Sequence, residues 1–170
     1  MRKIIFITGG QRSGKSSFAQ GLAESLSANP CYLATARHWD EDFKERIRRH
    51  QADRGDMWTT LEEEKLLSNH NLNGKTVLMD CVTLWLTNIF HDNEYKLNLS
   101  LDEAKREWSK FIEQDFTLIV VSNEIGMSLH ASNEMSRHFT DLQGWMNQHI
   151  ATTADEVYFI VSGIPVKIKG

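Results

Sequence analysis

Five short apolar runs, rich in β-branched and aromatic residues, recur along the chain. None of them alternates cleanly between apolar and polar positions, which is the pattern of strands that are buried on both faces. We therefore expect them to form the strands of a mostly parallel central sheet. In chain order they are KIIFIT (residues 3–8), CYLAT (31–35), TVLMD (76–80), FTLIVVS (116–122) and EVYFIVSG (156–163).

Between these runs, four segments carry apolar residues at the three- and four-residue spacing of an amphipathic helix. They are KSSFAQGLAESLS (residues 15–27), DEDFKERIRRHQAD (40–53), SLDEAKREWSKFIEQ (100–114) and NEMSRHFTDLQGWMNQHIATTA (133–154). Strands that alternate with helices predict an α/β fold with right-handed crossovers. The chain has no repeat, linker or low-complexity tract, so we expect residues 1–170 to form a single domain.

The composition is that of an ordinary globular protein, with 41% hydrophobic and 25% charged residues. A net charge of -4 argues against a nucleic-acid partner, and no apolar run is long enough for membrane insertion as a helix. Cys31 and Cys81 each lie in or beside an apolar run. We expect buried, reduced thiols rather than a disulfide or a metal pair, and hence a cytoplasmic protein.

The segment GGQRSGKS, residues 9–16, fits the phosphate-binding pattern G-x-x-x-x-G-K-S/T. Glycines let backbone N–H groups turn toward a phosphate, and the helix that follows adds the positive end of its dipole. Lys15 would reach the β- and γ-phosphates, and Ser16 would hold Mg²⁺. A glycine-rich turn could match by chance, but a strand before the segment and a helix after it favour nucleotide binding.

Two further strands end in polar residues. Asp80 closes the run TVLMD, where a carboxylate can hold the metal ion or its water, although it could instead cap the next helix. Asn123 and Glu124 follow FTLIVVS and should open toward the crevice at the carboxyl edge of the sheet, with a plain turn as the alternative. The guanine-reading pattern N-K-x-D is absent, and the chain is short for a motor ATPase. A small phosphoryl or nucleotidyl transferase fits best.

A candidate nucleophile lies in the segment ERIRRHQADRG. If residues 40–53 form a helix, Phe43, Ile47 and His50 share one face, and Arg46 and Arg54 flank the histidine one turn away on either side. A neutral imidazole there could attack a phosphorus atom while the guanidinium groups hold phosphate oxygens. A half-buried helix histidine without a catalytic role is the alternative, and this segment alone favours it.

Several motifs together resemble one enzyme family over essentially the whole chain. They are TGGQRSGKSSFA, YLATA, RIRRHQADRG followed by WTTLE, DCVTLWLTN, VSNEIGM and RHFTDLQGWMNQHIATTADEVYFIVSGIPVKIK. The sequence resembles the bifunctional adenosylcobinamide kinase/adenosylcobinamide-phosphate guanylyltransferase family of cobalamin biosynthesis. This resemblance implies a RecA-like P-loop domain with a mostly parallel sheet flanked by helices, and a trimer.

The resemblance also implies two reactions. A nucleoside triphosphate, either GTP or ATP, phosphorylates adenosylcobinamide, with Mg²⁺ as cofactor. A histidine, which corresponds to His50, then takes GMP from GTP and passes it on to give adenosylcobinamide-GDP. The nucleotide contacts that the family implies for this sequence are Gly9, Gly10, Gln11, Arg12, Ser13, Gly14, Lys15, Ser16, Ala34, Thr35, Ala36, Gln51, Ala52, Asp53, Arg54, Glu62 and Asp80.

Two other functions stay open on the sequence alone. The first is a P-loop kinase of small molecules without guanylyltransferase activity, in which His50 is structural. The second is a non-catalytic nucleotide-binding module. Lys15, Ser16 and Asp80 together argue against the second, because binding without turnover does not need a complete set of phosphate and metal ligands.

Overall fold

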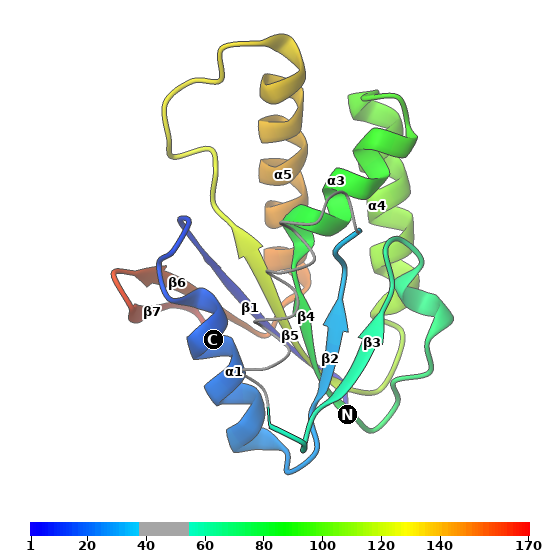
Figure 1. Cartoon of the computed structure of the whole chain (residues 1–170), viewed down its shortest axis with the longest axis vertical. Coiled ribbons are helices and arrows are strands. Elements are labelled where there is room, and N and C mark those ends of the chain that lie inside the picture. The colour runs from blue at the N-terminus through cyan, green and yellow to red at the C-terminus, as the bar shows by residue number, and fades with distance from the viewer. Residues whose placement is uncertain (38–54) are drawn as a thin grey trace.

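The computed structural model describes residues 1–37 and 55–170, and it is built around a seven-stranded sheet (Figure 1). The strand order is β3-β2-β4-β5-β1-β6-β7. Every neighbouring pair is parallel except the last, in which β7 runs antiparallel to β6. The strands are β1 (Lys3–Gly9), β2 (Cys31–Ala34), β3 (Thr59–Glu62), β4 (Thr76–Asp80), β5 (Thr117–Asn123), β6 (Glu156–Val161) and β7 (Ile164–Lys169).

Helices cover both faces of this sheet. Figure 1 shows α1 on one face and α3, α4 and α5 on the other. Their bounds are α1 (Lys15–Leu26), α3 (Val82–Asp92), α4 (Leu97–Phe111) and α5 (Glu134–Thr153), with a short 3-10 turn, η1 (Leu67–Asn69).

Alternate residues of the central strands enter two separate cores. In β1, Ile4 and Phe6 pack with the α3–α5 side, whereas Ile5 and Ile7 pack with the α1 side. Each strand is therefore buried on both faces, which is why its apolar residues run without interruption. The structure confirms the expected mostly parallel α/β sheet, and the five predicted strands are present as β1, β2, β4, β5 and β6.

The larger core lies on the α3–α5 side, and it buries two tryptophans completely. Trp85 and Trp108 are 0% exposed. Their indole N–H groups donate to the carbonyl oxygen of Lys65 (2.9 Å) and to Thr153 Oγ1 (3.1 Å), respectively. Because the polar atom of each ring is satisfied, each contributes the full benefit of burying a large apolar surface.

Two strands and one α-helix were not predicted, and each has a physical reason. The residues of β3 and β7 are mostly exposed, so they lack the apolar signature of the inner strands. Pro165 lies inside β7, which is tolerated because an edge strand does not need every N–H group. The helix α3 was missed because its sequence, VTLWLTNIFHD, is apolar for most of its length and resembles a buried strand as much as a helix.

Several other predictions can be compared directly. The helices predicted over residues 15–27, 100–114 and 133–154 correspond to α1, α4 and α5, although α4 begins three residues earlier, at Leu97. Cys31 and Cys81 are buried free thiols, as expected. The helix predicted over residues 40–53 lies outside the described residues. In the described part of the chain, no helix has the length and apolar character needed to cross a membrane.

Candidate active site

The segment predicted to bind phosphate connects β1 to α1 at the carboxyl edge of the sheet. Two of its glycines have backbone angles that favour glycine, with φ of 156° at Gly9 and 97° at Gly14. A Cβ atom on Gly9 would lie 2.6 Å from the carbonyl oxygen of Ile160, and one on Gly14 would lie 3.1 Å from the Cα of Gly163. The glycines are thus required by both conformation and space.

Lys15 points back into this loop. Its side chain is buried, and its Nζ donates to the carbonyl oxygen of Gly10. Burial lowers the pKa of Lys15, and nearby Cys81 and Asp80 act in the opposite direction. Burial also raises the pKa of Cys81 to about 12, so its thiol is neutral near pH 7 and Asp80 supplies the opposing charge. The loop thus holds the Lys15 ammonium group among its backbone groups, an arrangement suited to binding a polyphosphate.

The turn between β6 and β7 supports the loop from one side. Ser162 and Gly163 both have positive φ angles, 50° and 82°, and the backbone N–H of Gly163 donates to the carbonyl oxygen of Ser13 (2.8 Å). Sequence reasoning missed this contact because 150 positions separate its two partners. The local signal that could have suggested the hairpin is the dipeptide Ser162-Gly163 between two β-rich segments, because Ser-Gly marks turns.

Asp80 ends β4, and its side chain lies on the α1 face of the sheet, the face on which Lys15 stands. The Tyr32 hydroxyl donates to Asp80 Oδ2 (3.0 Å). The N-cap position of α3 belongs to Cys81, and α3 has no side-chain cap hydrogen bond among the described residues. The N-cap residue of α3 is thus Cys81 and not Asp80, the residue that the sequence offered as an alternative cap.

Asn123 and Glu124 lie beside the phosphate loop. Asn123 pairs in register with Gly9, and its N–H donates to Thr83 Oγ1 (3.2 Å). The Glu124 N–H donates to the carbonyl oxygen of Gly9 (2.9 Å). Both residues are only partly buried, so they stand at the edge where the sequence placed them.

A buried polar cluster behind Asn123 was not predicted. Gln143 Nε2 donates to Ser122 Oγ (2.8 Å) and to Asn147 Oδ1 (3.0 Å), and Ser122 Oγ donates to Asn147 Oδ1 (2.7 Å). Asn147 Nδ2 in turn donates to the carbonyl oxygen of Asn123 (3.1 Å). These side chains from α5 fix the end of β5, because buried polar groups must keep their partners.

The segment from Ala34 to Ala36 is held mainly by Thr35. Its buried hydroxyl donates to the carbonyl oxygen of Cys81 (2.8 Å) and accepts from the Cys81 N–H (2.9 Å). Asn88 Nδ2 donates to the carbonyl oxygen of Thr35 (2.8 Å). The Thr35 side chain thus shapes the segment, and partly exposed Ala36 is its most accessible residue.

Glu62 also lies at the carboxyl edge of the sheet, but far from the phosphate loop. It pairs with Ala34, which pairs on its other side with Asp80. Four strand spacings separate β3 from β1, or about 19 Å, whereas Asp80 on β4 is about 10 Å from β1. The structure brings Asp80 toward the phosphate loop but leaves Glu62 at the other end of the edge. His50, Gln51, Ala52, Asp53 and Arg54 lie outside the described residues.

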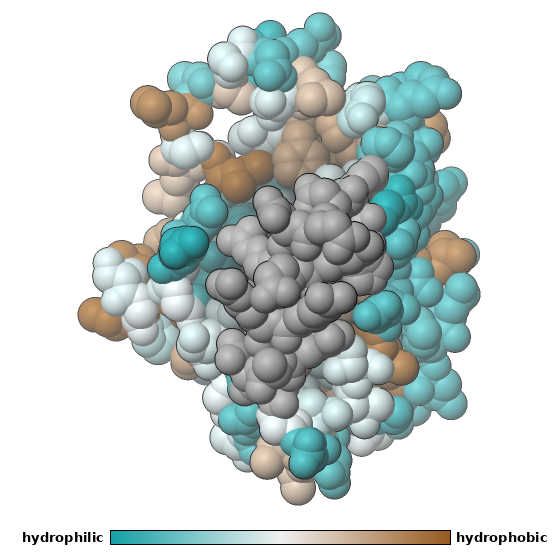
Figure 2. Space-filling view, viewed as in Figure 1, coloured by the Kyte–Doolittle hydropathy of each residue, from teal (hydrophilic) through white to brown (hydrophobic). Residues whose placement is uncertain are grey.

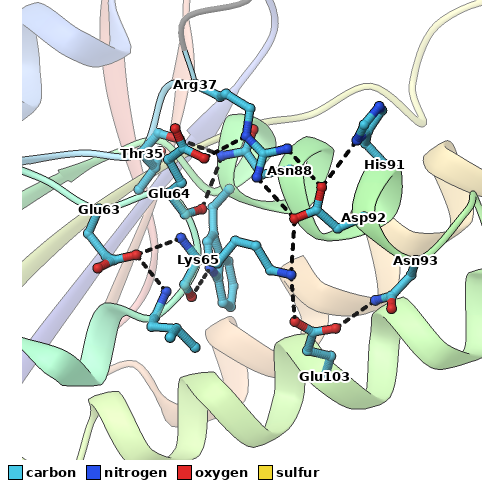
Figure 3. Close-up of polar contacts among 12 residues, drawn as sticks. Thr35, Arg37, Glu63, Glu64, Lys65, Asn88, His91, Asp92, Asn93 and Glu103 are labelled. Carbon is cyan, nitrogen blue, oxygen red and sulfur yellow. Dashed lines mark hydrogen bonds and ion pairs between the residues drawn. The ribbon is translucent and has the colours of Figure 1, made fainter.

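Beyond Ala36, Arg37 enters a charged network with the end of α3 (Figure 3). Its two terminal nitrogens donate to the two oxygens of Asp92 (2.8 and 3.0 Å), and its Nε donates to Glu64. Lys65 Nζ lies 3.2 Å from both Asp92 Oδ2 and Glu103 Oε1. The network ties the segments after β2 and β3 to α3 and α4, and sequence patterns gave no sign of it.

Replacing Asp92 by Asn should lower the free energy of unfolding by about 1–2 kcal/mol, because Arg37 and Lys65 would lose their shared counter-ion. The hydrogen bond from Arg37 holds the pKa of Asp92 well below its usual range. The ionised Asp92 carboxylate therefore contributes fully to the free energy of unfolding above the pKa of an unfolded aspartate, about 3.9. This contribution declines below that pH and is lost as pH falls through the pKa of Asp92 in the folded protein. Urea unfolding at pH 7 and pH 3 measures both effects.

The matched control is Glu94→Gln, which removes a carboxylate whose ion pair with Lys96 is exposed. It should leave the urea midpoint at pH 7 unchanged. If the difference in free energy of unfolding between wild type and Asp92→Asn is as large at pH 3 as at pH 7, the stabilisation does not come from the ionised carboxylate of Asp92.

Residues 5–168 match the family model described as cobinamide kinase / cobinamide phosphate guanyltransferase. The chain is 37% identical over 175 residues to the bifunctional adenosylcobalamin biosynthesis protein CobP of Pseudomonas aeruginosa, with 100% of this chain and 98% of the relative covered. It is 34% identical over 188 residues to the bifunctional adenosylcobalamin biosynthesis protein CobU of Escherichia coli, with 98% and 99% covered.

Among solved structures, a prototypical ATPase from the type III secretion system of pathogenic bacteria matches with a TM-score of 0.56. The match covers 92% of this chain and 50% of that chain, at 12% sequence identity. At this identity the likeness concerns the fold alone. It agrees with the expected RecA-like P-loop class.

Proposed function

The chain belongs to the cobinamide kinase / cobinamide phosphate guanyltransferase family, and from this premise we propose that it carries out both reactions of that description. In the first, a nucleoside triphosphate phosphorylates the free hydroxyl of cobinamide. In the second, GMP passes from GTP to cobinamide phosphate, giving cobinamide-GDP and pyrophosphate. The observation that carries the proposal is the glycine-rich loop closed around buried Lys15 at the carboxyl edge of a P-loop sheet.

The kinase step depends mainly on positioning and charge. Phosphoryl transfer needs the terminal phosphate held in line with the attacking hydroxyl, with its negative charge compensated. The backbone N–H groups of the phosphate loop and the Lys15 ammonium would supply that compensation. Asn123 and Glu124, fixed beside Gly9, border the same space.

We assign the guanylyl step to His50, on the basis of the family resemblance and of the chemistry of imidazole. A neutral ring nitrogen attacks the α-phosphorus of GTP, so a phosphorus–nitrogen bond forms as the bond to pyrophosphate breaks. The phosphate of cobinamide phosphate then attacks the same phosphorus and releases the imidazole. Gln51, Ala52, Asp53 and Arg54, next to His50 in the sequence, are proposed to contact this nucleotide.

Ser16 and Asp80 would hold Mg²⁺. Ser16 stands exposed in the first turn of α1 and Asp80 partly buried at the end of β4, and both offer hard oxygen atoms. Two protein ligands suffice because Mg²⁺ keeps several waters and takes phosphate oxygens from its substrate. Within the described ranges, no group of three His, Cys, Asp or Glu could hold a metal ion without such a substrate. Bound Mg²⁺ would neutralise phosphate charge during transfer.

Asp80→Asn should raise the Mg²⁺ concentration needed for half-maximal kinase rate by about ten-fold, because an amide is a weaker ligand than a carboxylate. The fold should persist, since Asn can still accept a hydrogen bond from Tyr32. A Mg²⁺ titration of the initial rate measures the shift. Asp102→Asn, which changes an exposed residue of α4, serves as the control. A Mg²⁺ titration of Asp80→Asn that coincides with that of wild type would exclude Asp80 from the metal site.

The proposed function is tested by incubating the protein with cobinamide, GTP and Mg²⁺ and analysing the products by mass. We expect cobinamide phosphate first and cobinamide-GDP afterwards, with release of pyrophosphate. Accumulation of cobinamide phosphate alone would favour the kinase-only alternative. Absence of both products would favour a nucleotide-binding module. The trimer implied by the resemblance stays a prediction, to be checked by light scattering.

A further inference from the structure

The loop between β5 and α5 leaves the sheet directly beside the phosphate loop. Its first residue, Glu124, donates its N–H to the carbonyl oxygen of Gly9 (2.9 Å), and its carboxylate accepts from the Gly126 N–H (2.9 Å). At the far end, Asn133 Oδ1 accepts from the Ser136 N–H (2.8 Å) and caps α5. Both ends are fixed to the fold, so the loop is held at the nucleotide edge.

Three large apolar side chains on this loop and on the first turn of α5 face solvent. Met127 is 76% exposed, Leu129 96% and Met135 49%. Loops usually carry small or polar residues, and large apolar side chains gathered in one exposed segment mark a surface for a ligand or partner. Figure 2 shows brown, apolar residues at the upper left, where Figure 1 draws this loop.

The position of the loop along the sheet matters as much as its composition. Met127 comes three positions after Glu124, so their Cα atoms are at most about 11 Å apart. β4 and β5 lie on one side of β1, and the β6–β7 hairpin lies on the other. Asp80, which would hold Mg²⁺ in the proposed function, ends β4 on the same side of β1 as β5. An acceptor that rests on the β5–α5 loop would lie on this same side of the phosphate loop.

The chemistry of a cobinamide acceptor matches this surface. A corrin ring is a broad macrocycle with largely apolar faces and amide groups at its rim, and the hydroxyl to be phosphorylated stands on a side arm. Covering exposed apolar side chains with such a face is favourable, and methionine adapts well to an irregular apolar shape. A ring placed on the loop leaves its side arm free to reach the nearby phosphate loop.

We propose that Met127, Leu129 and Met135 form the corrinoid-binding surface and hold one face of the ring during both transfers. This inference rests on the proposed function, because it assumes that cobinamide is the acceptor. It assigns to these residues a role in acceptor affinity and none in the handling of the nucleotide.

The test is the double variant Met127→Ser/Leu129→Ser, assayed against cobinamide at saturating nucleotide. We expect the KM for cobinamide to rise about ten-fold or more, with the KM for the nucleotide and the rate of GMP attachment from GTP alone within two-fold of wild type. Equilibrium dialysis with cobinamide, which is coloured, should show the same loss of affinity. The conservative pair Met127→Leu/Leu129→Met should restore the wild-type KM.

Leu26→Ser is the matched control, because Leu26 is 47% exposed at the end of α1 remote from the phosphate loop. It should leave the KM for cobinamide unchanged. An unaltered KM in the double serine variant overturns the inference while the proposed function stands. An equal loss of GMP attachment also overturns it, since that step involves no corrinoid. A wild-type protein that neither binds nor converts cobinamide overturns the proposed function and this inference together.

Discussion

Lys15→Ala should slow both phosphorylation of cobinamide and attachment of GMP by roughly 10²–10³-fold, about 3–4 kcal/mol of transition-state stabilisation. The reason is the position of its ammonium group, buried inside the loop and donating to the carbonyl oxygen of Gly10. A cation held there compensates phosphate charge without reorganising during the reaction. Alanine cannot do so.

The variant should remain folded, because alanine is the residue that best favours a helix and removal of a buried charge relieves its desolvation cost. The midpoint temperature of thermal unfolding should therefore be at least as high as that of wild type. Lys110→Ala is the matched control, since it deletes the same charge from an exposed position in the last turn of α4. Wild-type kcat/KM in Lys15→Ala would remove the phosphate loop from the mechanism.

His50→Asn should lower the yield of the covalent GMP adduct by a factor of about 10³ or more. The rate of guanylyl transfer should fall with it. Asparagine is similar in size and polarity to histidine but has no nucleophilic ring nitrogen. Phosphorylation of cobinamide should survive at least in part, because it depends on Lys15, Mg²⁺ and an aligned hydroxyl. The measurement is protein-bound label from GTP labelled at the α-phosphate, beside a kinase assay of the same preparation.

The bond itself gives a second readout. A phosphorus–nitrogen bond to imidazole is labile in acid and stable in alkali, unlike a phosphoester on serine. His138→Asn on α5 serves as the control and should retain the full adduct. An acid-labile adduct of wild-type yield in His50→Asn would identify another nucleophile and leave His50 as a structural residue.

The sequence predicted those parts of the site that a contiguous segment encodes. The phosphate loop was recognised because its glycines, Lys15 and Ser16 are neighbours in the chain, between a strand and a helix. The inner strands were recognised because burial on both faces leaves an unbroken apolar run. The helices α1, α4 and α5 carry their own periodicity. In each case the signal is local, and the structure places these elements where they were expected.

Contacts between distant segments could not be predicted in this way. Tyr32 donates to Asp80 across 48 positions, and Arg37 pairs with Asp92 across 55. Neither pairing has a local pattern, because each depends on which strands and helices become neighbours. The edge strands β3 and β7 were missed for a related reason: exposed residues carry little apolar signal, and pairing with a neighbour decides their conformation.

By itself, then, the sequence determined the fold class, the phosphate loop and, through family resemblance, the chemistry assigned to His50, which lies outside the described residues and stays a prediction. Only the tertiary structure decided that Asp80 stands on the Lys15 face of the sheet, that Glu62 lies some four strand spacings from β1, and that the β5–α5 loop begins beside the phosphate loop. Secondary-structure propensity and the pattern of buried positions depend on residues that are close together in the sequence. The distance between two sites is fixed by strand order, which emerges only when the whole sheet has assembled.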